Sequence, residues 1–155
     1  MTGHGPGQVL FHFVRHWARR PVTASAADAG GDQGRLVLVC EAVHALGRRG
    51  TPATVNAIAY EIGIDQSSAS RLVKSATAAG YVLMAASPAD GRRREASLTA
   101  AGRSMLDQAH RWQEEIFARL TAGWSDKRRR DFQQAMTDLM DRSYALDAPA
   151  TRTLR

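Results

Sequence analysis

Apolar residues recur through most of the chain at the spacing of an amphipathic helix. Two short stretches of this kind, residues 54–62 and 65–80, follow one another with only a glycine-containing turn between them. Thr54 and Asp65 are suited to cap the two helices, and Gly80 suits the left-handed position that ends the second. The inner stripe of the second helix falls at i, i+3, i+4 and i+7, and it consists of Ala69, Leu72, Val73 and Ala76. The pattern therefore predicts a helix-turn-helix.

The other face of the second helix is polar, and it carries cations but no carboxylate. It consists of Ser67, Ser70, Arg71 and Lys74. Small hydroxyl groups permit close approach to DNA, and Arg and Lys bind phosphates or base edges. An ordinary solvated helix face is an equally good interpretation of this helix alone. The neighbouring segments shift the balance toward DNA.

Residues 81–84 and 95–98 read as two short β-strands after this helix. Their connection contains a proline and an Asp-Gly turn signal, which predicts a hairpin. Three arginines, Arg92, Arg93 and Arg94, lie at its tip and descending edge. A hairpin tip has no core to fill, and the narrow minor groove of DNA is one ligand that attracts such a cluster.

The remaining apolar patterns predict four further helices, over residues 9–20, 35–49, 99–120 and 126–146. Residues 22–34, which are rich in Ala, Ser, Gly and Asp, predict a flexible connection. The helix after the hairpin has a heptad-like seam, made of Met105, Ala109, Trp112, Ile116 and Leu120. The two long helices after the hairpin carry more apolar surface than one small lobe can bury. Together with the first helix they favour a helical bundle shared between two copies of the chain.

Composition agrees with one basic domain of 155 residues, with a net charge of +6 and a pI of about 10.4. The excess is densest in residues 65–103, which hold 6 basic and 3 acidic side chains. This charge fits a polyanionic partner. A single cysteine excludes an intrachain disulfide, and the longest strongly apolar run, residues 36–40, is too short to cross a membrane. We therefore expect a soluble protein in the cytoplasm.

Several residues allow a second interpretation. Cys40 lies in an apolar run without an adjacent cation, so a buried structural thiol is favoured over a redox sensor. His12 and His16 form half a metal site without a third ligand nearby, which favours a dimer-interface role and no metal. The basic run 127–130 is favoured as a solvated face over a phosphate contact. No catalytic motif is present, so neither an enzyme nor a cofactor is expected.

The ordered set of motifs resembles the MarR-type winged-helix transcriptional regulators. The resemblance covers roughly residues 35–145 and is strongest over 54–106. It rests on Ile58-Ala59, on the run from Ile64 to Val73, on Gly80-Tyr81-Val82, on Asp90-Gly91-Arg92 and on Leu98-Thr99-Ala100-Ala101-Gly102. It implies a mainly α fold with a small β-hairpin wing: a winged helix-turn-helix plus a helical dimerisation bundle.

The resemblance also implies a role for individual residues. The DNA-contacting residues would be Gln66, Ser67, Ser68, Ser70, Arg71, Lys74, Arg92, Arg93 and Arg94. Asp90 would stabilise the wing as the partner of Arg92. A small aromatic or phenolic effector would bind between the dimer helices and the winged lobe, with His16, Trp17 and Trp112 as candidates to contact it.

The implied organisation has three parts. Residues 1–34 form a dimerisation helix and flexible loop, 35–98 the winged DNA-binding lobe, and 99–155 the C-terminal dimerisation helices. The implied function is a homodimeric regulator, more often a repressor, that binds a pseudo-palindromic double-stranded operator. The alternative is a winged helix that binds a protein partner and has no specific DNA role.

Overall fold

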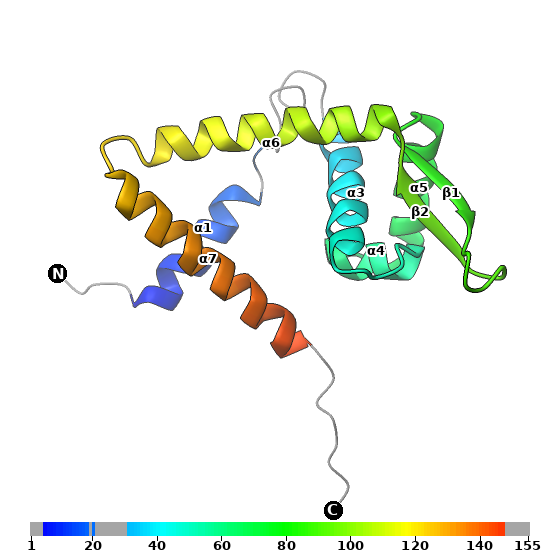
Figure 1. Cartoon of the computed structure of the whole chain (residues 1–155), viewed down its shortest axis with the longest axis horizontal. Helices are drawn as coiled ribbons and strands as arrows, with labels where there is room; N and C mark the ends of the chain where they lie inside the picture. The colour runs from blue at the N-terminus through cyan, green and yellow to red at the C-terminus, as the bar shows by residue number, and fades with distance from the viewer. Residues whose placement is uncertain (1–4, 19, 21–30, 148–155) are drawn as a thin grey trace, which may run out of the picture. The chain divides into compact units, whose positions relative to one another are not determined.

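The computed structural model describes residues 5–18, 20 and 31–147. These residues contain six helices and one two-stranded antiparallel sheet, in the order α1, α3, α4, α5, β1, β2, α6 and α7 (Figure 1). The chain divides into two compact units, residues 1–114 and 115–155. The predicted fold class, mainly α with a β-hairpin wing, is confirmed.

Helices α4, Val55–Ile62, and α5, Gln66–Ala78, form the predicted helix-turn-helix. The Thr54 side chain caps α4 by accepting a hydrogen bond from the Ala57 amide at 3.2 Å. Gly63 ends α4 at φ 79°, and Gly80 follows α5 at φ 80°, a region that favours glycine. The predicted inner stripe is confirmed, because Ala69, Val73 and Ala76 are buried and Leu72 is half-buried.

Helix α3, Gly31–Arg48, supplies the largest share of the buried core of the first unit. Its buried residues are Val37, Val39, Cys40, Ala42, Val43 and Leu46. The prediction of a helix over 35–49 is right, but its start is wrong, because residues 31–34 are helical and do not belong to a loop. Local composition was misleading there, since two glycines and an aspartate disfavour a helix only weakly against tertiary packing. Residues 22–30 of the predicted connection lie outside the described residues.

The hairpin consists of β1, Val82–Ala86, and β2, Arg94–Leu98, paired with Val82 opposite Leu98 and Ala86 opposite Arg94. Both strands are longer than predicted at the wing tip, because cross-strand pairing extends to Arg94. The Ala96 amide donates to the Ala53 carbonyl at 2.9 Å, which fixes the wing to the segment before α4. We call α3, α4, α5 and this hairpin the winged lobe.

Helix α6, Ala100–Leu120, begins where the wing ends. The Thr99 hydroxyl donates to the Gly80 carbonyl at 2.5 Å and accepts from the Gly102 amide at 3.1 Å, so Thr99 caps α6 as predicted and binds the end of α5. Helix α6 approaches the backbone of Tyr81 so closely at Gly102 that a side chain does not fit. A Cβ at this position would lie 2.1 Å from the Tyr81 carbonyl oxygen. These contacts explain the Leu-Thr-x-x-Gly motif physically.

Two helices bury none of their side chains within the chain. They are α1, Pro6–Trp17, and α7, Asp126–Asp147. Helix α1 begins three residues before the predicted Val9 and ends at Trp17, because Pro6 suits a first helical position. Helix α7 matches the predicted range within a residue. In the second unit, the Phe132 ring contacts the rings of Phe117 at 6.1 Å and Trp124 at 5.7 Å between centroids.

Candidate nucleic-acid interface

Asp65 organises the first turn of α5. Its carboxylate accepts hydrogen bonds from the Ser68 amide at 2.8 Å, the Ser68 hydroxyl at 2.6 Å and the Ser67 hydroxyl at 3.0 Å. The side-chain and backbone hydrogen bonds from Ser68, followed by that from Ser67, hold the pKa of Asp65 well below its usual range. The carboxylate is thus ionised at neutral pH, and the two hydroxyl hydrogens point toward it.

The outer face of α5 presents most of the predicted DNA-contacting residues to solvent. Gln66, Ser67, Arg71 and Lys74 are exposed, whereas Ser68 and Ser70 are half-buried. The Arg71 guanidinium donates to the Ser68 hydroxyl at 3.3 Å, which directs it along the helix toward its N-terminal turn. The sequence pattern therefore placed the cations on the exposed face correctly, but it did not reveal that two of the serines bind the capping carboxylate.

The wing tip is held by short-range hydrogen bonds to Asp90. Its carboxylate accepts from the Arg92 amide at 3.0 Å, and its carbonyl accepts from the Arg93 amide at 3.0 Å. Asp90 thus contacts the backbone of the turn, and within the described residues it forms no ion pair with Arg92. Arg92, Arg93 and Arg94 are all exposed, and Arg94 also donates to the Met84 carbonyl at 3.0 Å across the hairpin.

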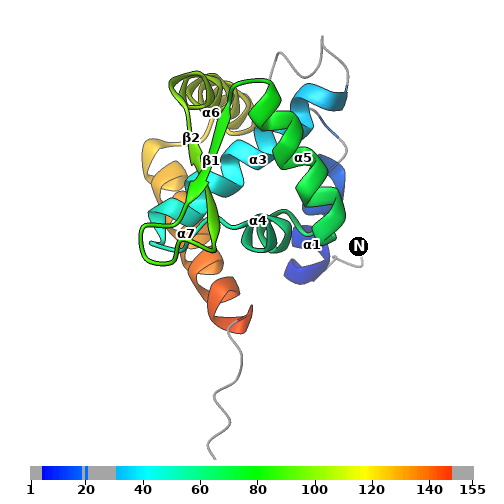
Figure 2. The same ribbon diagram turned by 90° about the vertical axis from the view of Figure 1, so that its right-hand side faces the viewer.

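The helix face and the wing belong to one lobe. Figure 2 shows α5 and the hairpin diverging from the turn that joins them, and in Figure 1 the wing loop extends beyond α3, α4 and α5. Exposed cations therefore occur on both elements: Arg71 and Lys74 on α5, and the three arginines on the wing. A positively charged helix beside a positively charged hairpin matches the alternating grooves and phosphate rows of duplex DNA.

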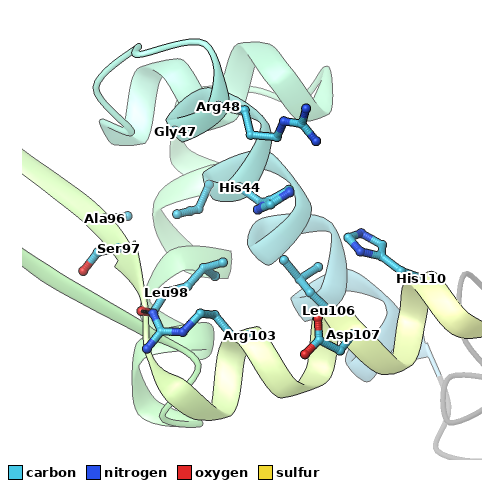
Figure 3. A pocket seen from close by; sticks show the side chains of 11 residues that line it. His44, Gly47, Arg48, Ala96, Ser97, Leu98, Arg103, Leu106, Asp107 and His110 are labelled. Carbon is cyan, nitrogen blue, oxygen red and sulfur yellow. Dashed lines mark hydrogen bonds between the residues drawn. The ribbon is translucent and has the colours of Figure 1, made fainter. Parts of the chain in front are cut away.

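A separate cavity of about 550 Å³ lies between α3, β2 and α6 (Figure 3). Its polar and charged lining consists of His44, Arg48, Ser97, Arg103, Asp107 and His110. Val43, Leu98 and Leu106 contribute its apolar wall. The arrangement combines two arginines, two histidines and one aspartate with an apolar surface, and the two arginines suit a small anion that carries a ring or chain.

Two histidines of this cavity form contacts that the sequence did not indicate. The His110 Nε2 atom lies 3.0 Å from a Glu41 carboxylate oxygen, and its ring centroid lies 5.9 Å from that of His44. The Gln113 amide also donates to Glu41, at 3.3 Å. His44 and Glu41 share one face of α3 by spacing, but their proximity to His110 depends on the packing of α6. No sequence signal identified it.

The predicted effector residues do not line this cavity. Trp112 is half-buried on α6, and the rings of His16 and Trp17 lie 5.9 Å apart on α1. Arg103 is held at the cavity by donating to the Leu98 carbonyl at 2.8 Å (Figure 3). Arg48 and Asp107 form no ion pair with any residue that the structure describes, so their charges remain available to a ligand.

The other candidate groups have structural surroundings. Cys40 is fully buried, and burial, with a smaller effect of the Glu41 charge, raises the pKa of its thiol to about 11. In the basic run, Lys127 pairs with Asp131 at 2.5 Å, Arg128 lies 4.1 Å from the Trp124 ring centroid, and Arg129 donates to the Thr121 carbonyl at 3.1 Å. Burial therefore keeps the Cys40 thiol protonated at neutral pH, and the contacts in the basic run occupy three of its four cations.

The described residues contain neither a metal-binding cluster nor a membrane-spanning helix. No group of three or more His, Cys, Asp or Glu side chains gathers there in a way that could hold a metal ion. Among the helices described, none is both long enough and apolar enough to span a bilayer.

Comparison with known proteins agrees with this architecture. Residues 38–93 match the sequence model of the MarR family. Among solved structures, apo MarR from E. coli is 17% identical, with 89% of this chain and 98% of that chain covered and a TM-score of 0.65. A mutant of S. aureus MepR bound to an oligodeoxyribonucleotide is 16% identical, with coverage of 89% and 98% and a TM-score of 0.54.

A third structure concerns the regulation of DNA binding of Bordetella bronchiseptica BpsR by 6-hydroxynicotinic acid. It is 19% identical, with 90% of this chain and 98% of that chain covered and a TM-score of 0.56. No curated protein matches the sequence. At these identities the structures establish the winged-helix fold, and the family match over residues 38–93 agrees with the resemblance read from the sequence.

Proposed function

We propose that this MarR-type winged helix binds double-stranded DNA and regulates transcription as a homodimer. The observation that carries the proposal is an exposed, cationic face of α5 beside a hairpin with three exposed arginines. The net charge of +3 in residues 65–103 supports it. Two proteins with the same fold bind DNA: a MepR mutant was solved with an oligodeoxyribonucleotide, and the DNA binding of BpsR is regulated by 6-hydroxynicotinic acid.

In this proposal α5 enters the major groove. Arg71 and Gln66 meet base edges, and Lys74 contacts phosphate, while the small serine side chains permit close approach. The wing enters the adjacent minor groove through Arg92 and Arg93, and Arg94 adds charge at its base. The contacts of Asp90 keep the wing turn in one conformation, which lowers the entropy cost of binding.

The proposed dimer uses the helices outside the winged lobe. Residues 1–34 and 99–155 form the dimerisation parts, and residues 35–98 form the DNA-binding part. Exposed apolar side chains support this division: Val9, Phe11, Phe13 and Val14 on α1, and Leu139, Met140 and Leu146 on α7. A two-fold dimer would place the two copies of α5 about 34–36 Å apart, one turn of DNA.

The proposed effector is a small aromatic or phenolic molecule with a negative charge. The cavity lined by His44, Arg48, Arg103, Asp107 and His110 supports this chemistry, because its two arginines lie beside an apolar wall. His16, Trp17 and Trp112 remain candidates to close the site from the dimerisation helices. A repressor would be released if the effector favoured the DNA-incompetent conformation by about 1–3 kcal/mol. Such a regulator acts on the chromosome in the cytoplasm and catalyses no reaction.

Fluorescence anisotropy tests the proposal directly. The full-length chain is titrated into the duplex upstream of its own gene and into a scrambled duplex, at several salt concentrations. We expect tighter binding to the first duplex and a steep loss of affinity with salt. Absence of binding to either duplex at low salt would overturn the proposal and favour the alternative, a winged helix that binds a protein partner.

A further inference from the structure

A second depression, of about 420 Å³, lies between the start of α3 and the side of α5. It is lined by Arg35, Leu36, Ser68, Arg71, Leu72 and Ser75. Arg35 lies in the second turn of α3, and α3 packs against α5, the helix that carries the proposed DNA face. The depression thus joins the proposed recognition surface to a helix outside the helix-turn-helix.

The polar groups around this depression leave a surplus of positive charge. Arg35 and Arg71 are both exposed, and within the described residues neither forms an ion pair. Ser75 donates its hydroxyl hydrogen to the Arg71 carbonyl at 3.1 Å, and Ser68 donates to Asp65 at 2.6 Å. The hydroxyl hydrogens are therefore occupied, and no carboxylate lines the depression. The Arg35 guanidinium is therefore left to bind an anion beside the exposed face of α5.

We infer that Arg35 binds a DNA phosphate at the edge of the major groove entered by α5, beside Arg71, which reaches the base edges. The inference rests on the proposed function and extends it to a residue of α3. A guanidinium group binds phosphate through two parallel hydrogen bonds, so it fixes geometry as well as adding charge. Contacts to phosphate set the register of a protein on the duplex without reading its sequence. Arg35 therefore positions α5, and base selection stays with α5 itself.

The test removes the positive charge of Arg35 and compares the effect on DNA binding with the removal of one arginine outside the winged lobe. Arg35→Gln and Arg111→Gln each remove one exposed arginine, the second from α6 outside the winged lobe. Both variants and the wild type are titrated into the upstream and scrambled duplexes over a range of salt concentrations. Thermal unfolding of each variant confirms that the fold is retained.

We expect Arg35→Gln to weaken binding to both duplexes by the same factor, about tenfold at low salt, so that their ratio is unchanged. The slope of log K against log salt should become shallower by about 0.9, the value for one lost phosphate contact. Arg111→Gln should leave affinity and slope as in the wild type. Arg35→Lys should keep the slope, because the charge remains, but bind less tightly than the wild type.

Three outcomes would overturn the inference. Wild-type affinity and slope for Arg35→Gln would show that Arg35 does not touch the backbone. A loss confined to the upstream duplex would make it a base contact instead. Equal effects of Arg35→Gln and Arg111→Gln on affinity would show that Arg35 acts only through the net charge of the protein and makes no specific phosphate contact. The proposed function survives all three, and it fails only if the wild type binds neither duplex.

Discussion

Helices α5 and α7 expose opposite kinds of surface. Helix α5 has 13 residues and buries Ala69, Val73 and Ala76, so that a polar and cationic face remains outside. Helix α7 has 22 residues and buries none, and its Leu139 and Met140 side chains are 45% and 47% exposed. Helix α5 therefore buries its apolar stripe within the chain, whereas the apolar side chains of α7 remain exposed to solvent.

This difference separates two kinds of partner. A cationic face loses little by staying in water and gains by meeting a polyanion, so it suits DNA. Contiguous apolar side chains on a long helix favour burial against another protein surface. A second copy of the chain would bring the same helices, and a two-fold arrangement lets each copy cover the other. The following predictions break or sharpen the contrast between the two helices.

The largest effect is expected from a charge on the apolar face of α7. Leu139→Asp should convert the proposed dimer to monomer and cost about 4 kcal/mol or more of association energy, because an unpaired carboxylate would be buried. Sedimentation velocity at micromolar concentration measures the change. Gln133→Asp adds the same charge at an exposed polar position of α7 and should remain dimeric. A monomeric wild type would contradict the dimer proposal.

The junction between the winged lobe and α6 gives the next effect. Gly102→Ala should destabilise the chain by about 1–3 kcal/mol, because the new Cβ would lie 2.1 Å from the Tyr81 carbonyl oxygen. Gly47→Ala is the matched control, since it is also a helical glycine but has open space around it. It should stabilise by about 0.5–1 kcal/mol. Urea unfolding measures both, and equal midpoints would show that the close contact relaxes freely.

The polar face of α5 and the wing should respond differently to the loss of one arginine. Arg71→Ala should cost about 1–3 kcal/mol of binding and relax preference at one operator position. Arg92→Ala should weaken binding more evenly across sequences, as loss of a minor-groove charge does. Anisotropy with singly substituted operators separates the two patterns. Unchanged affinity in both variants would remove these residues from the interface.

The smallest effect concerns Cys40, in the core shared by α3, α5 and the hairpin. Folding raises the pKa of the Cys40 thiol from 9.0 to about 11, so the unfolded chain loses this proton first as the pH rises. Stability from this group is therefore complete below pH 9 and falls between pH 9 and 11, by about 1 kcal/mol at pH 10. Urea unfolding of wild type and Cys40→Ala at pH 8 and pH 10 measures it. The wild type should lose more stability than the variant over this range.

The parts that sequence predicted well are those that local signals determine. The limits of α4 and α5 follow from the caps Thr54 and Asp65 and from glycines at positive φ, all of which lie within a few residues of the helix ends. The polar face of α5 follows from helical periodicity. Local pattern alone therefore predicts which cations α5 exposes to solvent.

The parts that sequence missed depend on distant contacts. The contact between His110 and Glu41 spans 69 positions, and the depression at Arg35 needs α3 packed beside α5. The strands extend to Ala86 and Arg94 because each stabilises the other by pairing. The hydrogen bonds from Ser67 and Ser68 to Asp65 are local, but helical periodicity does not predict them. Periodicity sorts the residues of the helix into faces, and Asp65 precedes the helix as its cap.

The hydrogen bonds of Thr99 have a mechanical consequence. Its hydroxyl joins the Gly80 carbonyl after α5 to the Gly102 amide in α6, and its amide donates to the Tyr81 carbonyl at 3.1 Å. The end of α5, the root of the hairpin and the first turn of α6 are thus linked through one residue, Thr99. A tilt of α6 at this end would turn the helix and the hairpin together, as a rigid pair, and leave their mutual spacing unchanged.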